Sequence, residues 1–199
     1  MFSARLLAAA APALFVLTAC GGGDEGASTT TAGGTPPTAS SAPVEVSKAD
    51  AEAADGTITA TLDGEARTWY VTSGELGGEF NSQSDWSGST TYTSVSLFGH
   101  TTPKTTMSSK NAMLVGFTVS GDNQTVSMPS VSLLTDSLLR RYEGEGSDVT
   151  VALEEMSVDG EWLHLKGTFS GTLTYTDSSG ATKDPVTVTD GTFDLRVHD

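Results

Sequence analysis

The sequence contains a single cysteine, Cys20, among its 199 residues. One thiol cannot form a disulfide within the chain, so a folded domain must be held together by its core. Positive charge is scarce as well, because 10 Lys and Arg face 25 Asp and Glu and give a formal net charge of −15. Nucleic-acid binding depends on neutralising phosphates with Lys and Arg, so this charge balance argues against a nucleic-acid partner.

A hydrophobic run long enough to cross a bilayer is also missing. The longest apolar run covers residues 6–17, whereas a transmembrane helix needs about 20 apolar residues. Arg5 precedes this run, and a positive charge followed by a short apolar segment is typical of a secretory signal peptide. We therefore predict a signal peptide over residues 1–19, and we expect any membrane attachment to come from something other than a spanning helix.

The end of this signal, residues 17–20, reads LTAC and resembles the lipobox of bacterial lipoproteins. The resemblance implies that Cys20 is diacylated, becomes the first residue after cleavage and is usually N-acylated. Several acyl chains anchor a protein stably, whereas one chain binds reversibly. Gly21 after the cysteine, in place of Asp, implies sorting to the outer membrane in a source with two membranes. The alternative is an ordinary signal peptide with an incidental cysteine.

Large apolar side chains are nearly absent from the next segment. In residues 21–46 only valine supplies large aliphatic side chains, so this part cannot bury enough apolar area to offset its ordering entropy. Ser47, with Asp50 three residues later, supports at most a frayed turn of helix. We predict that residues 20–55 form the lipidated cysteine and a disordered, flexible tether, and that residues 56–199 form one domain.

Residues 56–199 contain short segments in which apolar and polar residues alternate, the period of a half-buried strand. The clearest segment has its apolar residues at odd positions: Leu163, Leu165, Phe169, Leu173 and Tyr175. Similar alternation occurs within residues 58–62, 69–71, 95–97, 113–119, 126–128, 149–158 and 186–197. About eight short strands separated by Gly and Asp turns predict an all-β fold, an antiparallel β-sandwich or partly open barrel.

Two of these segments change phase partway. The last one has its apolar residues at even positions before Asp190-Gly191 and at odd positions after it, which requires one extra residue. We predict a β-bulge there. We predict a second bulge at Glu154-Glu155, where the segment 149–158 changes phase in the same way.

In one segment, residues 132–144, which read SLLTDSLLRRYEG, a helix competes with a strand as the predicted structure. Leu134 and Leu138 have the i, i+4 spacing of a helix face, and Ser132 is a suitable N-cap. A short helix and a continued β-structure are both left open for this segment.

The two ends of the predicted domain carry turn and core motifs. They read GTITATLDGEARTW at the start, and LKGTFSGTL and VTVTDGTFDLRV at the end. These motifs resemble those of small bacterial lipoprotein domains of unknown function. The resemblance implies a β-sandwich-like fold, and it carries no catalytic residue.

Motifs of common enzymes and metal sites are missing. In GTFSG the serine, Ser170, comes one place too late for the G-x-S-x-G elbow of α/β-hydrolases. The three histidines lack HExxH spacing, no acidic turn reproduces the calcium loop, and a lipidated Cys20 leaves no reactive thiol. We predict no catalytic residue, no metal site and no cofactor, and we interpret His164 as a surface residue of its strand.

The segment SGELGGEFNSQSDWSGSTTY, residues 73–92, is predicted to be a long Gly/Ser-rich loop. Loops on rigid β-scaffolds commonly carry binding residues. The candidate binding residues in it are Glu79, Asn81, Asp85 and Trp86. Trp86 can stack on a sugar ring or anchor a partner protein. Alternatively, Trp86 folds back over the open edge of the sandwich.

Three classes of function fit this sequence. The first, which we favour, is a monomeric binding or interaction module anchored by lipid to the cell envelope, with a protein or glycan partner. The second is a carbohydrate- or solute-binding lipoprotein, which a deep apolar pocket with convergent polar groups would favour. The third is an enzyme whose site is assembled from distant residues, which a cluster of mutually hydrogen-bonded titratable groups would favour.

Overall fold

The computed structural model describes residues 46–199, apart from residues 77–78, 90, 104–108, 138 and 182. The predicted signal peptide, Cys20 and most of the predicted tether lie outside the described residues and stay predictions. Within the described part of the chain, no helix is both long and apolar enough to cross a membrane.

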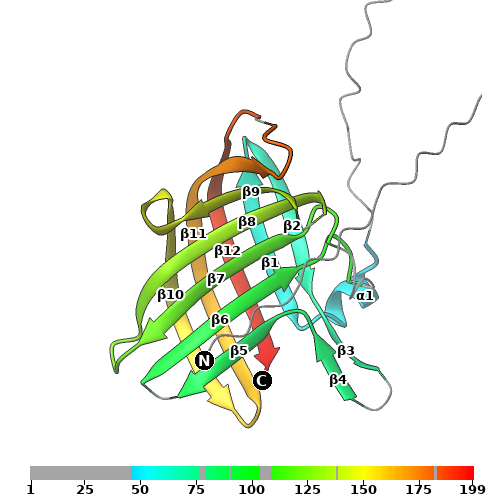
Figure 1. Ribbon diagram of the computed structural model, residues 1–199. Helices are drawn as coiled ribbons and strands as arrows, with labels where there is room; N and C mark the ends of the chain where they lie inside the picture. Colours follow the sequence, from blue (N-terminus) through cyan, green and yellow to red (C-terminus); the bar gives the residue numbers. More distant parts are fainter. Residues whose placement is uncertain (1–45, 77–78, 90, 104–108, 138, 182) are drawn as a thin grey trace, which may run out of the picture. The chain divides into compact units, whose positions relative to one another are not determined.

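The described chain is mostly β-structure, because each alternating segment supplies one apolar face (Figure 1). Its helical segments are α1 (Lys48–Glu52) and the 3₁₀ turn η1 (Gly146–Asp148). The strands are β1 (Gly56–Leu62), β2 (Glu65–Val71), β3 (Ser73–Leu76), β4 (Glu79–Ser82), β5 (Asp85–Ser89), β6 (Tyr92–Gly99), β7 (Met113–Ser120), β8 (Thr125–Ser137), β9 (Arg140–Glu145), β10 (Val149–Asp159), β11 (Trp162–Asp177) and β12 (Val186–His198). The predicted helical turn is confirmed, since the Ser47 hydroxyl accepts a hydrogen bond from the Asp50 N–H at 3.2 Å.

Ten strands form one antiparallel sheet in the order β2-β1-β12-β11-β9-β8-β7-β6-β5, with β10 also paired to β11. The long strand β11 changes partner along its length, because residues 162–171 pair with β10 and residues 174–177 pair with β9. The sheet curls into a half-barrel (Figure 1). Tyr70 and His100 exchange two backbone hydrogen bonds of 2.8 Å, which join the ends of β2 and β6. The predicted all-β, antiparallel fold is confirmed.

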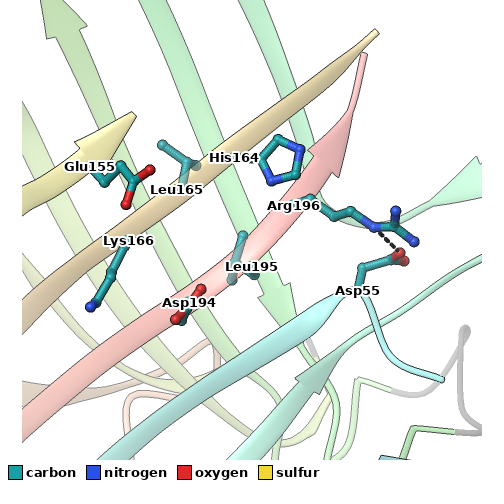
Figure 2. A pocket seen from close by; sticks show the side chains of 8 residues that line it. All are labelled: Asp55, Glu155, His164, Leu165, Lys166, Asp194, Leu195 and Arg196. Carbon is teal, nitrogen blue, oxygen red and sulfur yellow. Dashed lines mark hydrogen bonds and ion pairs between the residues drawn. The ribbon is translucent and has the colours of Figure 1, made fainter. Parts of the chain in front are cut away.

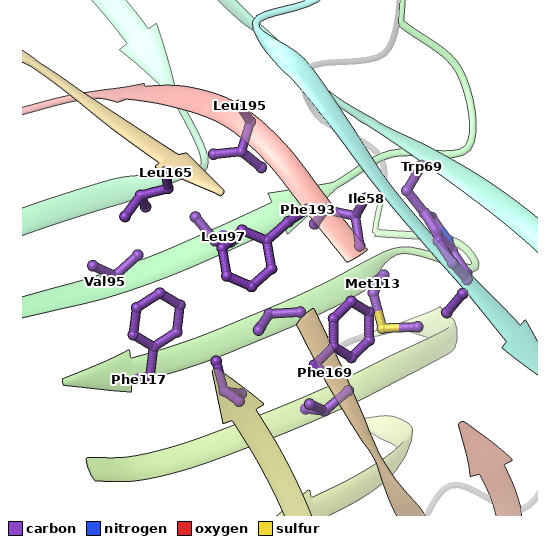
Figure 3. Packing of buried hydrophobic residues seen from close by; sticks show 14 of the residues in the cluster. Ile58, Trp69, Val95, Leu97, Met113, Phe117, Leu165, Phe169, Phe193 and Leu195 are labelled. Atoms are coloured by element: carbon purple, nitrogen blue, oxygen red, sulfur yellow. The ribbon is translucent and has the colours of Figure 1, made fainter. Parts of the chain in front are cut away.

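Inward-facing side chains from opposite parts of the sheet form one apolar core (Figure 3). Trp69 is almost fully buried, and its Nε1 donates a hydrogen bond to the Asn111 carbonyl at 2.8 Å. Phe117 and Phe193 stack within the core with ring centroids 5.8 Å apart. The space that the described strands enclose is therefore occupied by packed side chains.

Both predicted bulges are confirmed. The strand β12 has one extra residue in its pairing with β11, and Asp190 takes a positive φ of 52° there. The strand β10 has one extra residue between its partners on β11, so Glu154 and Glu155 are both exposed instead of alternating between the two faces. The bulge in β10 therefore adds a carboxylate to the outer face of the sheet.

The helical alternative for residues 132–144 is wrong, because β8 and β9 occupy this segment. The cause is burial on both faces of β8. Leu133 packs in the main core, while the adjacent Leu134 packs with Phe98 and Ala112 in a second apolar cluster. Adjacent leucines here reflect a strand that is covered on both sides, where the simple alternation is lost.

Candidate functional site

The prediction that residues 73–92 form a long loop is wrong, because this segment contains the strands β3, β4 and β5. Backbone pairing of β3 with β4 and of β5 with β6 orders this polar part of the chain without apolar alternation. Glu79 and Asn81 lie on β4, and their side chains are outside the described part of the structure. Asp85 and Trp86 lie on β5, at the end of the main sheet.

Trp86 is half-buried and packs against the main core. Its Nε1 donates a hydrogen bond to the Glu161 carbonyl at 3.3 Å, in the turn between β10 and β11. The backbone N–H of Asp199 donates to the same carbonyl at 2.9 Å. The indole thus covers the edge of the sheet at β5, which agrees with the second of the two interpretations of Trp86. Binding by the four candidate residues of this segment stays a prediction.

A shallow hollow of about 220 Å³ lies on the outer face of β10, β11 and β12 (Figure 2). The residues that line it are Asp55, Glu155, His164, Leu165, Lys166, Asp194, Leu195 and Arg196. The two leucine side chains are buried in the core, because successive side chains of a strand point to opposite faces. The side chain of His164 is exposed on the outer face, as the sequence predicted.

The register of the three strands decides which charges meet in the hollow. Lys166 of β11 lies opposite Asp194 of β12 on one side and opposite Glu155 of β10 on the other. The bulge in β10 adds Glu154, whose Oε2 lies 3.7 Å from the Lys166 Nζ. One ammonium group therefore has carboxylates on both sides.

Arg196 forms the other end of the hollow (Figure 2). Its Nε donates a hydrogen bond to the Asp55 Oδ1 at 3.1 Å, and its guanidinium carbon lies 4.5 Å from the centre of the Trp162 ring. The Asp55 side chain is only 7% exposed and also accepts a hydrogen bond from the Ser73 hydroxyl. Because an ion pair and an aromatic ring both hold the guanidinium, Arg196 is a fixed part of the wall.

The hollow is equipped for ionic recognition. Its walls combine carboxylates, an ammonium group, a guanidinium group and an imidazole, and of these side chains that of Asp55 is nearly buried. Within the described residues, the imidazole of His164 has no hydrogen bond to a carboxylate or a hydroxyl, so no base and nucleophile are paired there. In the same part of the chain, no group of three or more His, Cys, Asp and Glu side chains is arranged to hold a metal ion.

A second set of polar contacts lies where the end of β11 meets β9. The Asp177 carboxylate accepts hydrogen bonds from the Ser179 backbone N–H at 2.7 Å and from the Tyr175 hydroxyl at 3.1 Å. Arg140 of β9 lies 3.5 Å from the same carboxylate. The Ser179 hydrogen bond is the main reason why the pKa of Asp177 is lowered, while desolvation and the contact with Asp177 raise the pKa of Tyr175. These contacts fix the turn between β11 and β12, which is a structural role.

The hollow was not predicted from the sequence. The alternation of β11 and the bulge in β10 can be predicted, and they indicate exposed side chains at His164, Lys166 and Glu154. The pairing register that brings Asp194 and Asp55 beside them is a tertiary property, since these residues lie in separate segments.

Comparisons with known proteins give no match to this chain. No family model, no curated protein and no solved structure matches it. The resemblances to the lipobox and to small lipoprotein domains therefore stay predictions, and the function has to follow from the geometry of the described residues.

Proposed function

We propose that the protein is a lipid-anchored, envelope-exposed binding module that holds its partner on the outer face of β10, β11 and β12. The observation that supports this proposal is the hollow of charged side chains on that face, with a guanidinium group fixed by Asp55 and Trp162. Fixed polar groups lose little freedom on binding, which favours recognition at such a surface.

The filled core favours this class over a solute-binding lipoprotein. Small solutes are usually held in concave, largely enclosed and mostly apolar pockets. Here the enclosed space is packed with aliphatic and aromatic side chains, and the hollow is shallow, polar and on the outside. An enzyme has less support, because the His164 imidazole has no carboxylate or hydroxyl hydrogen-bond partner among the described residues.

The proposed lipid anchor at Cys20 and the tether that follows it set how far this surface lies from the membrane. The LTAC sequence at residues 17–20 supports acylation of Cys20. As a coil, the roughly 27 residues between Cys20 and α1 would span on the order of 25 to 30 Å. The domain is therefore held clear of the lipid headgroups, with its outer face open to the envelope.

Metabolic labelling with a fatty-acid probe tests the anchor. The full-length chain should be labelled in its own cells, and the Cys20→Ser variant should not, because the acylated thiol is then missing. Labelling that survives in Cys20→Ser would refute the lipid anchor.

Site-specific photo-crosslinking tests the binding surface. A benzophenone amino acid is placed at Thr168 of β11, next to the hollow on the same outer face, or at Ser94 of β6 as a control on another part of the sheet. Both positions are exposed, so neither change disturbs the core. We expect an envelope component to be cross-linked from Thr168 and not from Ser94. Equal cross-linking from both positions, or none from Thr168, would overturn the proposed surface.

A further inference from the structure

We infer that the partner held by the hollow is a protein, and that it docks a basic segment whose Lys or Arg side chains pair with Glu155 and Asp194. This inference rests on the proposed function and names its partner class. The observations that carry it are the ion pairs formed inside the hollow and the charge of the whole chain.

The first observation is an excess of carboxylates in the hollow. Among the described residues, the ammonium group of Lys166 forms its ion pair with Glu154, and the guanidinium group of Arg196 forms its ion pair with Asp55. Both internal cations are therefore already paired. Glu155 and Asp194 lie on either side of Lys166, are exposed, and have no ion pair within the described residues.

The second observation is that these carboxylates do not converge on one point. Glu155 and Asp194 belong to β10 and β12, and β11 with Lys166 lies between them. A small metal ion needs ligands around a single centre, and an ammonium group between the carboxylates repels it. Lys and Arg side chains have long stems and several N–H donors, so two of them can reach the two carboxylates separately.

The third observation is the negative net charge of the whole chain and the electrostatic field that it produces. A formal net charge of −15 attracts a basic partner from a distance and repels an acidic one. A neutral glycan can offer hydroxyl donors to the two carboxylates, but it brings no counter-charge and gains nothing from this long-range field. Charge complementarity therefore favours a basic protein segment as the occupant.

Fluorescence anisotropy with a defined probe tests the inference. The full chain, purified in detergent, is titrated with a labelled peptide that carries arginine at alternate positions. The variant Glu155→Gln/Asp194→Asn should bind it about two- to thirtyfold more weakly, the range expected for losing two exposed ion pairs. The matched control Asp122→Asn/Asp148→Asn removes the same charge from exposed turns outside the hollow and should change affinity less than about twofold. Equal weakening in both variants would show attraction by net charge alone and overturn the inference.

A gain-of-binding variant guards against misfolding. Lys166→Gln removes the central ammonium group and releases Glu154 from its ion pair, so the probe should bind about two- to fivefold more tightly. An unfolded or damaged protein would not show this tightening. Unchanged or weaker binding by Lys166→Gln would contradict the inference.

Photo-crosslinking in cells separates failure of this inference from failure of the proposed function. A Thr168 adduct that contains a protein, and that decreases in Glu155→Gln/Asp194→Asn, supports both. A Thr168 adduct that is a glycan, or that persists unchanged in the double variant, overturns the basic segment and leaves the binding surface intact. The absence of any Thr168 adduct overturns both.

Discussion

Asp55 and Arg196 are 141 positions apart in the chain and are joined by two hydrogen bonds. The backbone N–H of Arg196 donates to the Asp55 carbonyl at 2.9 Å, and its Nε donates to the Asp55 Oδ1 at 3.1 Å. The N–H of Asp55 donates in turn to the Val71 carbonyl at 2.8 Å. Asp55, which the sequence placed in the tether, is therefore bound to β12 and β2 and fixes the chain where it enters the sheet.

Replacing Asp55 by alanine should lower the free energy of unfolding by about 1 to 3 kcal/mol, because the hydrogen bonds from Arg196 and Ser73 to a charged carboxylate are lost. Urea denaturation of the purified chain measures the change. Asp122→Ala, at an exposed turn, is the matched control and should stay within about 0.5 kcal/mol of wild type. Equal losses in the two variants would contradict the role of Asp55.

Gly191→Ala should destabilise the core by about 1 to 3 kcal/mol, the usual cost of overpacking. Gly191 lies opposite Phe169 in the pairing of β12 with β11. A Cβ at Gly191 would overlap the Phe169 carbonyl and come within 2.8 Å of its ring. Gly74→Ala is the control, since a Cβ there meets nothing within 4 Å. A Gly191→Ala variant as stable as Gly74→Ala in urea would show that the close packing is not needed.

The period of two predicted the strands correctly wherever one face is buried and the other exposed. In β11, for example, Leu163, Leu165 and Phe169 are buried, whereas His164, Lys166 and Thr168 are exposed. The rule fails for Leu133 and Leu134, because each packs in a different apolar cluster on its own side of β8. No count of apolar positions separates that pattern from a helix face.

The polar segment from β3 to β5 was misread for a different reason. Its strands are ordered by backbone pairing of β3 with β4 and of β5 with β6, and among the side chains that the structure describes there, Trp86 packs against the core. The hollow could not be predicted from the sequence, because it depends on the register in which the strands pair. Only the alignment of β10, β11 and β12 places Glu155 and Asp194 on either side of Lys166.

Trp86→Phe should cost about 0.5 to 1.5 kcal/mol of unfolding free energy, because it keeps a packed ring and loses the hydrogen bond from Nε1 to Glu161. Trp86→Ala should cost more, since the packing is lost as well. Thermal or urea denaturation measures both variants. Normal stability together with lost partner binding in Trp86→Ala would instead support the binding role predicted for Trp86 from the sequence.

Acid should weaken the turn between β11 and β12 through Asp177. The Ser179 N–H lowers the pKa of Asp177, so its stabilising effect is complete above the ordinary carboxyl pKa of about 3.9 and is lost as the pH falls through the lower value of the folded state. Below about pH 4, the urea midpoint of the wild type should therefore fall more steeply than that of Asp177→Asn, which lacks this titration. Parallel curves for the two proteins would contradict the assignment.

Quantitative capture of the partner from the native envelope tests the binding surface most directly. The tagged full-length chain, the hollow variant Glu155→Gln/Asp194→Asn and the control Asp122→Asn/Asp148→Asn are compared after detergent extraction, with the recovered partner measured by mass spectrometry. We predict that one basic protein is recovered with the wild type and the control, and that its recovery falls about twofold or more with the hollow variant. Equal recovery with both double variants would contradict binding on the outer face of β10, β11 and β12.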